Sequence, residues 1–145
     1  ILKARVENLI ENRKRLREKF RSDFFSQQYS VNKSLKEELF IQKVSDIIIE
    51  NLSNQSFSVD DLAQNLNLSR SQLFRKMKQI SDESPIDFIR LVRLKKAVEL
   101  LMLPNMNISD VAFQVGFSDA SYFSRSFASF YGESPKKYIE KHKNN

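Results

Sequence analysis

The chain of 145 residues has the length of one compact domain, or of a small domain with an added segment. Hydrophobic residues make up 41% of it, and twelve Phe with only two Gly and three Pro favour an all-helical fold packed on Phe and aliphatic side chains. The absence of cysteine excludes disulfides, thiolate metal sites and cysteine nucleophiles, and no apolar run approaches the ~18 residues of a membrane-spanning helix.

The single histidine, His142, lies near the C-terminus without a second histidine, so we expect it to be solvated rather than a ligand or a general base. No paired His and carboxylate, phosphate-binding loop or thiol is present, so we expect no enzyme activity, no metal and no cofactor. The first residues of this sequence do not have the pattern expected of a signal peptide. The first residue is Ile instead of Met, which indicates a fragment of a longer protein.

The formal net charge of +6 favours an acidic partner, but this charge is concentrated at the start of the chain. Residues 1–21 have eight Lys or Arg against three Glu, whereas residues 22–145 have 16 basic and 15 acidic residues. Overall charge therefore does not establish DNA binding, and the argument has to come from local patterns.

Residues 1–36 are predicted to be a connector. Within it, residues 2–20 form an amphipathic helix that Arg13 interrupts. Two interpretations stay open: a helix that packs on its own protein, and a short coiled coil between two chains, for which fewer than three heptads is marginal. The polar residues 22–36 indicate a linker. A helix is then expected from about Leu35 to Leu52, with these residues on its buried side: Phe40, Val44, Ile47, Ile48 and Leu52.

Beyond residue 55 the chain repeats itself. Residues 59–69 (VDDLAQNLNLS) match residues 108–118 (ISDVAFQVGFS) at an offset of 49, and residues 73–89 match residues 123–139 at an offset of 50. Because the offset changes, the second copy carries one extra residue, which we expect around Asp119–Ser121.

The polar residues at the ends of each copy predict a short helix followed by a second helix. Ser58 with Asp61 can cap the first short helix, and Ser69 with Gln72 forms a capping box for the next one. Ser118 is the expected start of the corresponding helix in the second copy.

A tight turn is predicted between the two helices of each copy. Asn67 and Gly116 occupy equivalent positions there, and both residue types tolerate a left-handed backbone. Each copy closes with Ser-Pro, at positions 84–85 and 134–135, which predicts an N-cap followed by proline in the first helical turn. Short helix, tight turn and second helix make a helix-turn-helix, present twice.

A longer helix joins the copies and is expected to end at Pro104-Asn105. It is apolar on more than one side, as a helix that packs against both copies would be. Its ~17 residues span ~26 Å at ~1.5 Å per residue, which is comparable with the ~34 Å turn of B-DNA. The predicted fold is all-α: two helix-turn-helix subdomains joined by a long central helix, with an N-terminal amphipathic linker helix. Its parts are the DNA-binding domain at 37–145, the first helix-turn-helix at about 58–82, the linker helix at about 85–103 and the second helix-turn-helix at about 108–132.

The first predicted recognition helix, residues 69–81, has four basic residues and no acid before Asp82. Leu73, Met77 and Ile80 should face inward. Arg75 is placed to bond guanine O6 and N7 together. A solvated basic face is the alternative, but the helix-turn-helix context favours DNA. The candidate DNA contacts are Ser69, Arg70, Ser71, Phe74, Arg75 and Lys78.

The second predicted recognition helix, residues 119–131, has one basic residue. Its stripe of Phe123, Phe127 and Phe130 is interpreted as core packing rather than as a ligand site. We therefore predict that the first unit dominates affinity and that the second supplies register and phosphate contacts. The candidate contacts are Ser118, Ser121, Tyr122, Ser124 and Arg125, with Lys136 and Lys137 as phosphate contacts or solvated surface.

Residues 108–127 (ISDVAFQVGFSDASYFSRSF) followed by residues 131–138 (YGESPKKY) resemble the C-terminal DNA-binding domain of the AraC/XylS family of transcription regulators. The resemblance covers residues 40–142. It implies that the two units enter successive major grooves of double-stranded DNA on one face. Ala120 and Ala128 depart from the family pattern, because the first lacks a polar side chain and the second replaces a Lys or Arg. The implied base-reading positions are Ser71, Phe74, Arg75, Ala120, Ser121, Ser124 and Arg125.

Residues 2–20 (LKARVENLIENRKRLREKF) are similar to the connector that follows the receiver domain in hybrid two-component regulators. This implies an output domain controlled by receiver phosphorylation elsewhere, often at genes for polysaccharide use. Homodimerisation through residues 2–20 or an upstream domain, and contact with RNA polymerase, are further expectations. The expected location of this domain is the cytoplasm. If the full-length protein is a hybrid sensor, we expect that protein to be anchored in a membrane.

Two other classes of function stay open. A helical protein-interaction scaffold would show no salt-dependent affinity for DNA. An architectural DNA-binding protein would bind random duplexes as well as a promoter, and the near-neutral charge of residues 22–145 argues against it.

Overall fold

The computed structural model describes residues 34–143, and these residues form helices and connecting loops without strands. The all-α prediction is therefore confirmed. The predicted amphipathic helix at residues 2–20 and most of the predicted linker lie outside the described residues. The helices are α2 (Leu35–Glu50), α3 (Val59–Asn65), α4 (Arg70–Ser81), α5 (Pro85–Leu101), α6 (Ile108–Gln114), α7 (Ala120–Tyr131) and α8 (Pro135–Lys143).

Helix α2 begins with a capping box. The Ser34 hydroxyl accepts a hydrogen bond from the Glu37 amide at 3.2 Å, and the Glu37 carboxylate accepts one from the Ser34 amide at 3.2 Å. Its buried face consists of Ile41, Val44, Ser45 and Ile48. The predicted buried face is thus shifted by part of a turn: Phe40 and Ile47 are half-buried, and Leu52 lies beyond the end of the helix.

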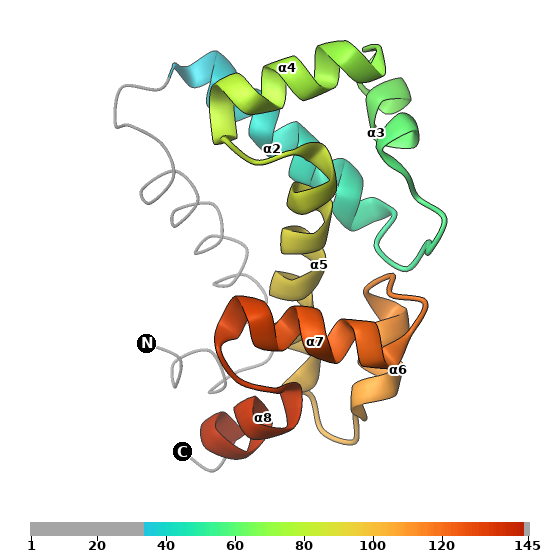
Figure 1. Ribbon diagram of the computed structural model, residues 1–145, viewed down its shortest axis with the longest axis vertical. Helices are drawn as coiled ribbons and strands as arrows, with labels where there is room; N and C mark the ends of the chain where they lie inside the picture. The colour runs from blue at the N-terminus through green and yellow to red at the C-terminus, as the bar shows by residue number, and fades with distance from the viewer. Residues whose placement is uncertain (1–33, 144–145) are drawn as a thin grey trace.

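Two hydrophobic cores lie at the two ends of α5. The first core includes Phe88, Ile89 and Val92 from the N-terminal half of this helix. The second includes Leu94, Ala97, Val98 and Leu101 from its C-terminal half. The helix is 17 residues long and is apolar on more than one side because it packs into both cores, as predicted. Figure 1 shows α2, α3 and α4 around one end of α5, and α6, α7 and α8 around the other.

The helix-turn-helix unit occurs twice, as α3–α4 and α6–α7. In the first unit both predicted capping boxes are present: the Ser58 hydroxyl accepts from the Asp61 amide, and the Ser69 hydroxyl accepts from the Gln72 amide, each at 3.1 Å. In the second unit, Asn107 takes the place of Ser58 and accepts from the Asp110 amide at 2.8 Å. These caps satisfy amide groups that a helix leaves unpaired in its first turn.

The turn inside each unit has a left-handed residue at the predicted position. Asn67 has φ 58° and Gly116 has φ 95°. The residue that follows returns its amide to the preceding helix, which closes the helix end. This backbone bond is 2.9 Å long in both units: Leu68 N donates to Ala63 O, and Phe117 N donates to Ala112 O.

The start of α7 differs from the prediction. Asp119, not Ser118, is the N-cap, and its carboxylate accepts from the Ser121 amide at 2.7 Å and from the Tyr122 amide at 3.2 Å. The extra residue of the second copy therefore lies in the turn, at Ser118, and not around residues 119–121. The reason is that a carboxylate one residue later caps the same helix, so the serine is left exposed in the turn.

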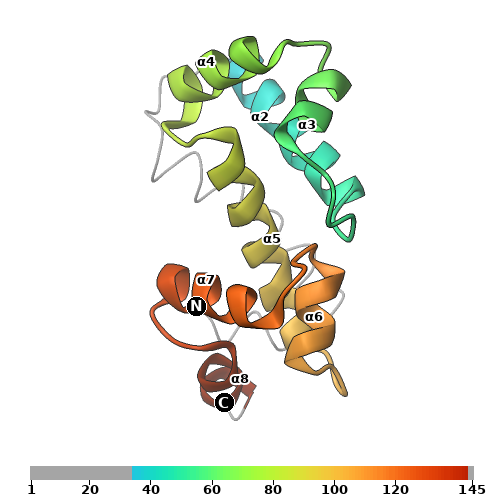
Figure 2. The same ribbon diagram turned by 45° about the vertical axis from the view of Figure 1, so that its right-hand side comes forward.

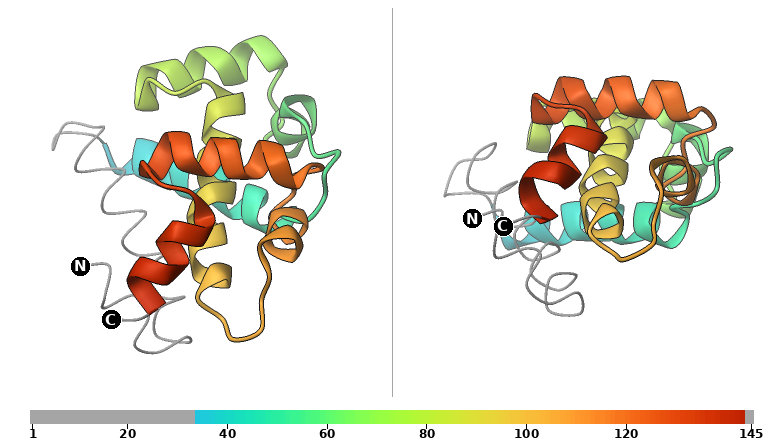
Figure 3. Two further views of the ribbon diagram at one scale, coloured as in Figure 1. Left: turned by 60° about the horizontal axis from the view of Figure 1, so that its bottom comes forward. Right: turned by 90° about the horizontal axis from the view of Figure 1, so that it is seen from below.

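The two second helices, α4 and α7, lie on the same side of the molecule. In Figure 1 they run across the two ends of α5, and the turned view in Figure 2 keeps this arrangement. Seen along the long axis in Figure 3, α7 lies over α4 at one edge of the molecule and α2 lies at the opposite edge. A flat or gently curved partner can therefore meet both helices at once.

His142 is buried, contrary to the expectation of a solvated residue. Only 6% of its surface is exposed, and its ring stacks on Tyr138 with ring centroids 4.1 Å apart. Its Nδ1 lies 2.9 Å from the Tyr138 carbonyl oxygen. The two residues are four positions apart in the sequence, so α8 places their side chains on one face, where Tyr138 belongs to the second core.

The Phe stripe of α7 is only partly core. Phe123 and Phe127 are fully buried, as predicted, but Phe130 is 47% exposed, so its predicted burial is wrong. Phe130 lies beside the Lys95 ammonium group, which is 5.4 Å from the ring centroid. Ile80, the equivalent residue of the first unit, is buried, so the spacing of the stripe does not account for the exposure of Phe130.

Alanine variants of Phe127 and Phe130 should differ in stability, because the first residue is in the core and the second is at the surface. Phe127→Ala should lower the free energy of unfolding by about 3–5 kcal/mol, because it leaves a cavity between packed rings. Phe130→Ala should lower it by only about 0.5–1 kcal/mol, the size of an exposed cation–π contact. Urea unfolding followed by circular dichroism measures both, and equal losses would contradict this assignment.

Candidate nucleic-acid interface

The exposed side of α4 carries the candidate contacts of the first unit. Leu73, Met77 and Ile80 face the first core, as predicted. The Ser69 N-cap is exposed, and Phe74 is half-buried. The exposed side chains of the helix form one continuous surface, which consists of Arg70, Ser71, Gln72, Arg75, Lys78 and Gln79.

The four basic residues of α4 differ in what they contact. The Arg70 Nη1 lies 3.1 Å from an Asp60 carboxylate oxygen of α3, and the guanidinium lies over the Phe74 ring at 5.3 Å. Lys76 turns the other way, with its Nζ 4.7 Å from the centroid of the Phe40 ring on α2. Arg75 and Lys78 have no ion-pair partner within residues 34–143 and are exposed. They therefore carry the positive charge of this surface that is available to a phosphate or a base.

The exposed side of α7 has fewer charged groups. Ser121, Tyr122 and Arg125 are exposed, whereas Ala120 and Ser124 are half-buried. The Tyr122 ring packs on Phe117 with ring centroids 5.5 Å apart, so it is held at the edge of the turn. The carboxylate of the N-cap Asp119 lies at the start of this surface, where the first unit has the neutral Ser69.

The predicted residues fall into three groups in space. The α4 and α7 groups belong to helices that lie on the same side of the molecule (Figure 3). Ser118 is exposed in the turn before α7. Lys136 and Lys137 form the third group, exposed in the first turn of α8, where the Lys137 amide donates to the Ser134 hydroxyl at 3.2 Å.

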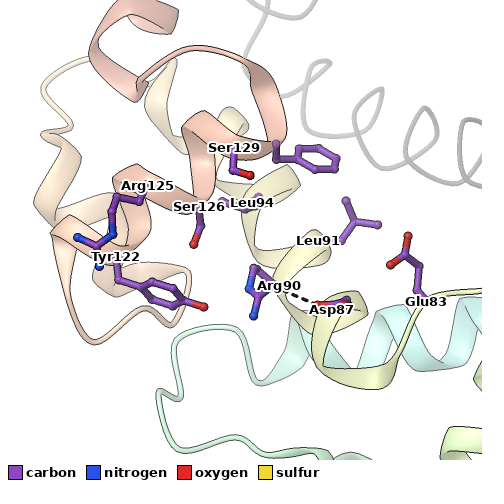
Figure 4. Close-up of a pocket in the computed structure, with 10 residues that line it drawn as sticks. Glu83, Asp87, Arg90, Leu91, Leu94, Tyr122, Arg125, Ser126 and Ser129 are labelled. Atoms are coloured by element: carbon purple, nitrogen blue, oxygen red, sulfur yellow. Dashed lines mark hydrogen bonds and ion pairs between the residues drawn. The ribbon is translucent and has the colours of Figure 1, made fainter.

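Arg90 of α5 also faces this side and was not predicted from the sequence. A hollow between α5 and α7 is lined by Arg90, Tyr122, Arg125 and Ser126, and Figure 4 shows Arg90, Tyr122 and Ser126 pointing into it. The Arg90 Nη1 pairs with the Asp87 carboxylate at 3.1 Å. The signal in the sequence was a charged pair three residues apart on an otherwise apolar helix.

Within residues 34–143, no group of three or more His, Asp or Glu side chains is arranged to hold a metal ion. No helix in this part of the chain is long and apolar enough to cross a membrane.

Comparison with known families matches this geometry. A family model described as "Helix-turn-helix domain" matches residues 62–141, which run from α3 to α8. The chain belongs to the AraC-type helix-turn-helix family of transcription regulators. The resemblance read from residues 108–138 is thereby confirmed, and α4 and α7 are the second helices of the two units of this AraC-type domain.

Curated relatives of this AraC-type chain are longer than it is. "Histidine kinase P4" of Formosa agariphila is 35% identical over 136 residues, which cover 94% of the chain but 10% of that protein. "Msm operon regulatory protein" of Streptococcus mutans is 37% identical over 98 residues, which cover 68% of the chain and 35% of that protein. The chain thus spans about a tenth to a third of the length of these relatives.

Solved structures share the fold. The C-terminal domain of the two-component response regulator yesN from Fusobacterium nucleatum is 29% identical, with a TM-score of 0.63 over 69% of this chain and 97% of that one. The DNA-binding domain of AdpA, solved in complex with a target DNA, has a TM-score of 0.66 at 23% identity over 72% of this chain and 93% of that one. At that identity the second likeness shows the fold alone.

The role of α4 in DNA binding can be checked by comparing the alanine variant of Arg75 with that of a basic residue on the opposite edge of the molecule. If Arg75 makes the predicted bidentate contact to guanine, Arg75→Ala should weaken binding to a specific duplex by about 1–3 kcal/mol. Lys43→Ala, which removes an exposed charge from α2 on the opposite edge, is the matched control and should leave affinity within about twofold, because a charge away from the duplex neutralises no phosphate. Fluorescence anisotropy measures both, and equal effects would contradict the assignment of α4 as the contact helix.

Proposed function

We propose that this chain is the output module of a two-component-type regulator, and that it recognises a promoter by inserting α4 and α7 into successive major grooves. The observation that carries the proposal is the placement of both helices on one side of the molecule, held by a single helix that packs into both cores. Helix-turn-helix proteins read base edges with the second helix of each unit.

We propose that α4 supplies most of the affinity. Arg75 and Lys78 are exposed and free of ion pairs within residues 34–143, and Ser69 leaves the positive end of the helix dipole unneutralised. On α7, the carboxylate of Asp119 occupies the equivalent place and repels a phosphate. The second unit then fixes the position of the domain along the duplex through Ser121 and Arg125, and its electrostatic attraction to the DNA phosphates is weaker.

The phosphate contacts would flank the base-reading helices. Lys136 and Lys137 are exposed in the first turn of α8, beyond the second unit, and Arg90 lies between the two units. Lys and Arg at such positions fix the register on the duplex without reading sequence. Ser118, in the turn before α7, and Tyr122, in the first turn of α7, complete the group on the side of the second unit.

The two-component assignment rests on the relatives and on the connector. One relative is named a histidine kinase, and one similar structure is the C-terminal domain of a two-component response regulator. We infer that residues 1–36 connect the DNA-binding domain at 37–145 to an upstream receiver, whose phosphorylation sets the activity. The chain itself carries no catalytic step in this proposal, and it acts in the cytoplasm as a dimer that contacts RNA polymerase.

The proposal is tested by measuring the affinity of this chain for two fluorescent duplexes at two salt concentrations. One duplex is the region upstream of the chain's own operon, and the other has the same base composition in scrambled order. We expect the promoter duplex to bind about 10³-fold more tightly or better, and both affinities to fall as salt rises. Equal affinity for the two duplexes would support an architectural DNA-binding protein instead, and affinity for neither would support a protein-interaction scaffold.

A further inference from the structure

Arg93 lies where the two halves of the molecule meet. It is the residue of α5 between Val92, which belongs to the first core, and Leu94, which belongs to the second. Its Nη2 donates to the Asn54 carbonyl oxygen at 3.2 Å, in the loop that follows α2. The guanidinium therefore ties α5 to a loop of the first unit.

The second unit lies against one side of the same guanidinium, and Arg93 as a whole is half-buried. Its Nε is buried and has no hydrogen-bond partner within residues 34–143. Burial lowers the pKa of Arg93 below its usual value, and the interaction with Tyr122 of α7 acts in the opposite direction. A buried Arg nitrogen without a partner costs free energy, so its position has to be held by surrounding contacts.

Gly116, in the turn of the second unit, lies next to this guanidinium. A Cβ atom placed on Gly116 would lie 2.7 Å from Arg93 Nε and 2.9 Å from Arg93 Cζ, and it would collide with the Leu52 carbonyl oxygen. The Leu52 side chain itself packs against the second core, although the residue follows α2 of the first unit. Backbone of one unit thus touches backbone of the other at a position that has no side chain.

We propose that the contact of Gly116 with Arg93 and Leu52 fixes the angle and separation of α4 and α7, so that Arg93 and Gly116 are positioning residues that set the spacing between the two half-sites. A single helix that joins two units leaves them free to bend or twist about that helix. A second contact away from the axis of α5 removes this freedom. The consequence for DNA spacing rests on the proposed function, whereas the consequence for the distance between α4 and α7 does not.

The duplication within the chain supports this role for Gly116. Its equivalent in the first unit is Asn67, which has φ 58° and whose side chain is exposed to solvent. The turn between two such helices therefore accepts a side chain. Gly116 is buried instead, and a side chain there would meet the other unit.

Gly116→Ala and Gly132→Ala form a matched pair for the test. Both glycines have positive φ, 95° and 82°, so alanine strains the backbone at each. A Cβ at Gly132 meets nothing within 4 Å, whereas one at Gly116 meets Arg93 and Leu52. The difference between the two variants therefore isolates the contact from the strain.

The distance between α4 and α7 can be measured without DNA. The chain has no cysteine, so Gln79→Cys and Ser129→Cys place two spin labels at equivalent exposed positions of the two helices. Pulsed electron paramagnetic resonance should give one narrow distance distribution for this parent and for its Gly132→Ala variant. Gly116→Ala should shift or broaden the distribution, and a distribution equal to that of Gly132→Ala would overturn the proposal.

Arg93→Met provides a second route, in case Gly116→Ala does not fold. Methionine keeps an apolar stem but removes the donor to the Asn54 carbonyl oxygen, so the distribution should broaden while the thermal melting curve remains cooperative. Arg93→Lys, which keeps one donor, should restore part of the narrow distribution. An unchanged distribution in Arg93→Met would remove Arg93 from the proposal.

The effect on half-site spacing is tested by measuring the affinity for duplexes in which the distance between the two half-sites is changed. The probe is a duplex selected from a random pool by the wild-type chain, with one base pair inserted between its half-sites, which moves one half-site by about 3.4 Å and about 34°. The wild type should lose about tenfold in affinity on this change, and Gly116→Ala less than about threefold. An equal loss in both would contradict the effect on spacing. A wild type that selects no duplex would contradict the proposed function, and the spin-label distances would still test the positioning contact.

Discussion

The side chains of α5 enter two different hydrophobic cores, and the position of every DNA-facing group depends on this. Phe88 is fully buried in the first core, and Leu101 is fully buried in the second. Each such side chain contributes about 1.5–3 kcal/mol through burial, so neither unit can detach from α5 without exposing a large part of its core. The two helix-turn-helix units are therefore held as parts of one molecule, and α4 and α7 keep a common side.

The two copies of the repeat correspond closely in their buried residues and differ at several exposed positions. Leu73 and Phe123 occupy equivalent buried positions, and so do Met77 and Phe127. On the exposed side, one basic pair is equivalent, Arg75 and Arg125. Three other equivalent positions have changed from charged or polar to small or acidic: Arg70 to Ala120, Lys78 to Ala128 and Ser69 to Asp119. Two units with the same fold thus present surfaces of different charge, and the proposal that the first unit supplies most of the affinity rests on this difference.

Most of the fold could be predicted because its signals are local. Capping residues such as Ser58 and Ser69, and the left-handed turn at Asn67 and Gly116, act within four residues of their own position. The internal repeat then predicted the residue range of the second unit by comparison with the first. The start of α7 was misplaced because Ser118 and Asp119 are both good N-caps, and only the backbone path through the turn selects between them.

The features that the sequence did not reveal depend on contacts between distant segments. The spacing of Phe130 fits the Phe stripe, but the side chain lies at the surface beside Lys95 of α5. His142 was expected in solvent because nothing local indicated that α8 folds its last turn onto the second core. Arg93 belongs to the same class, since its partners, Asn54 and Gly116, are 39 and 23 residues away in the sequence.

Hydroxyl-radical footprinting of the wild-type chain on a duplex that it selects tests the central claim most directly, namely that both recognition helices engage one DNA face together. The account predicts two protected patches on the same face, separated by about 10 base pairs, the length of one helical turn. A single protected patch, with unaltered cleavage one turn away on either side, would contradict the claim and reduce the second unit to a structural support for the first.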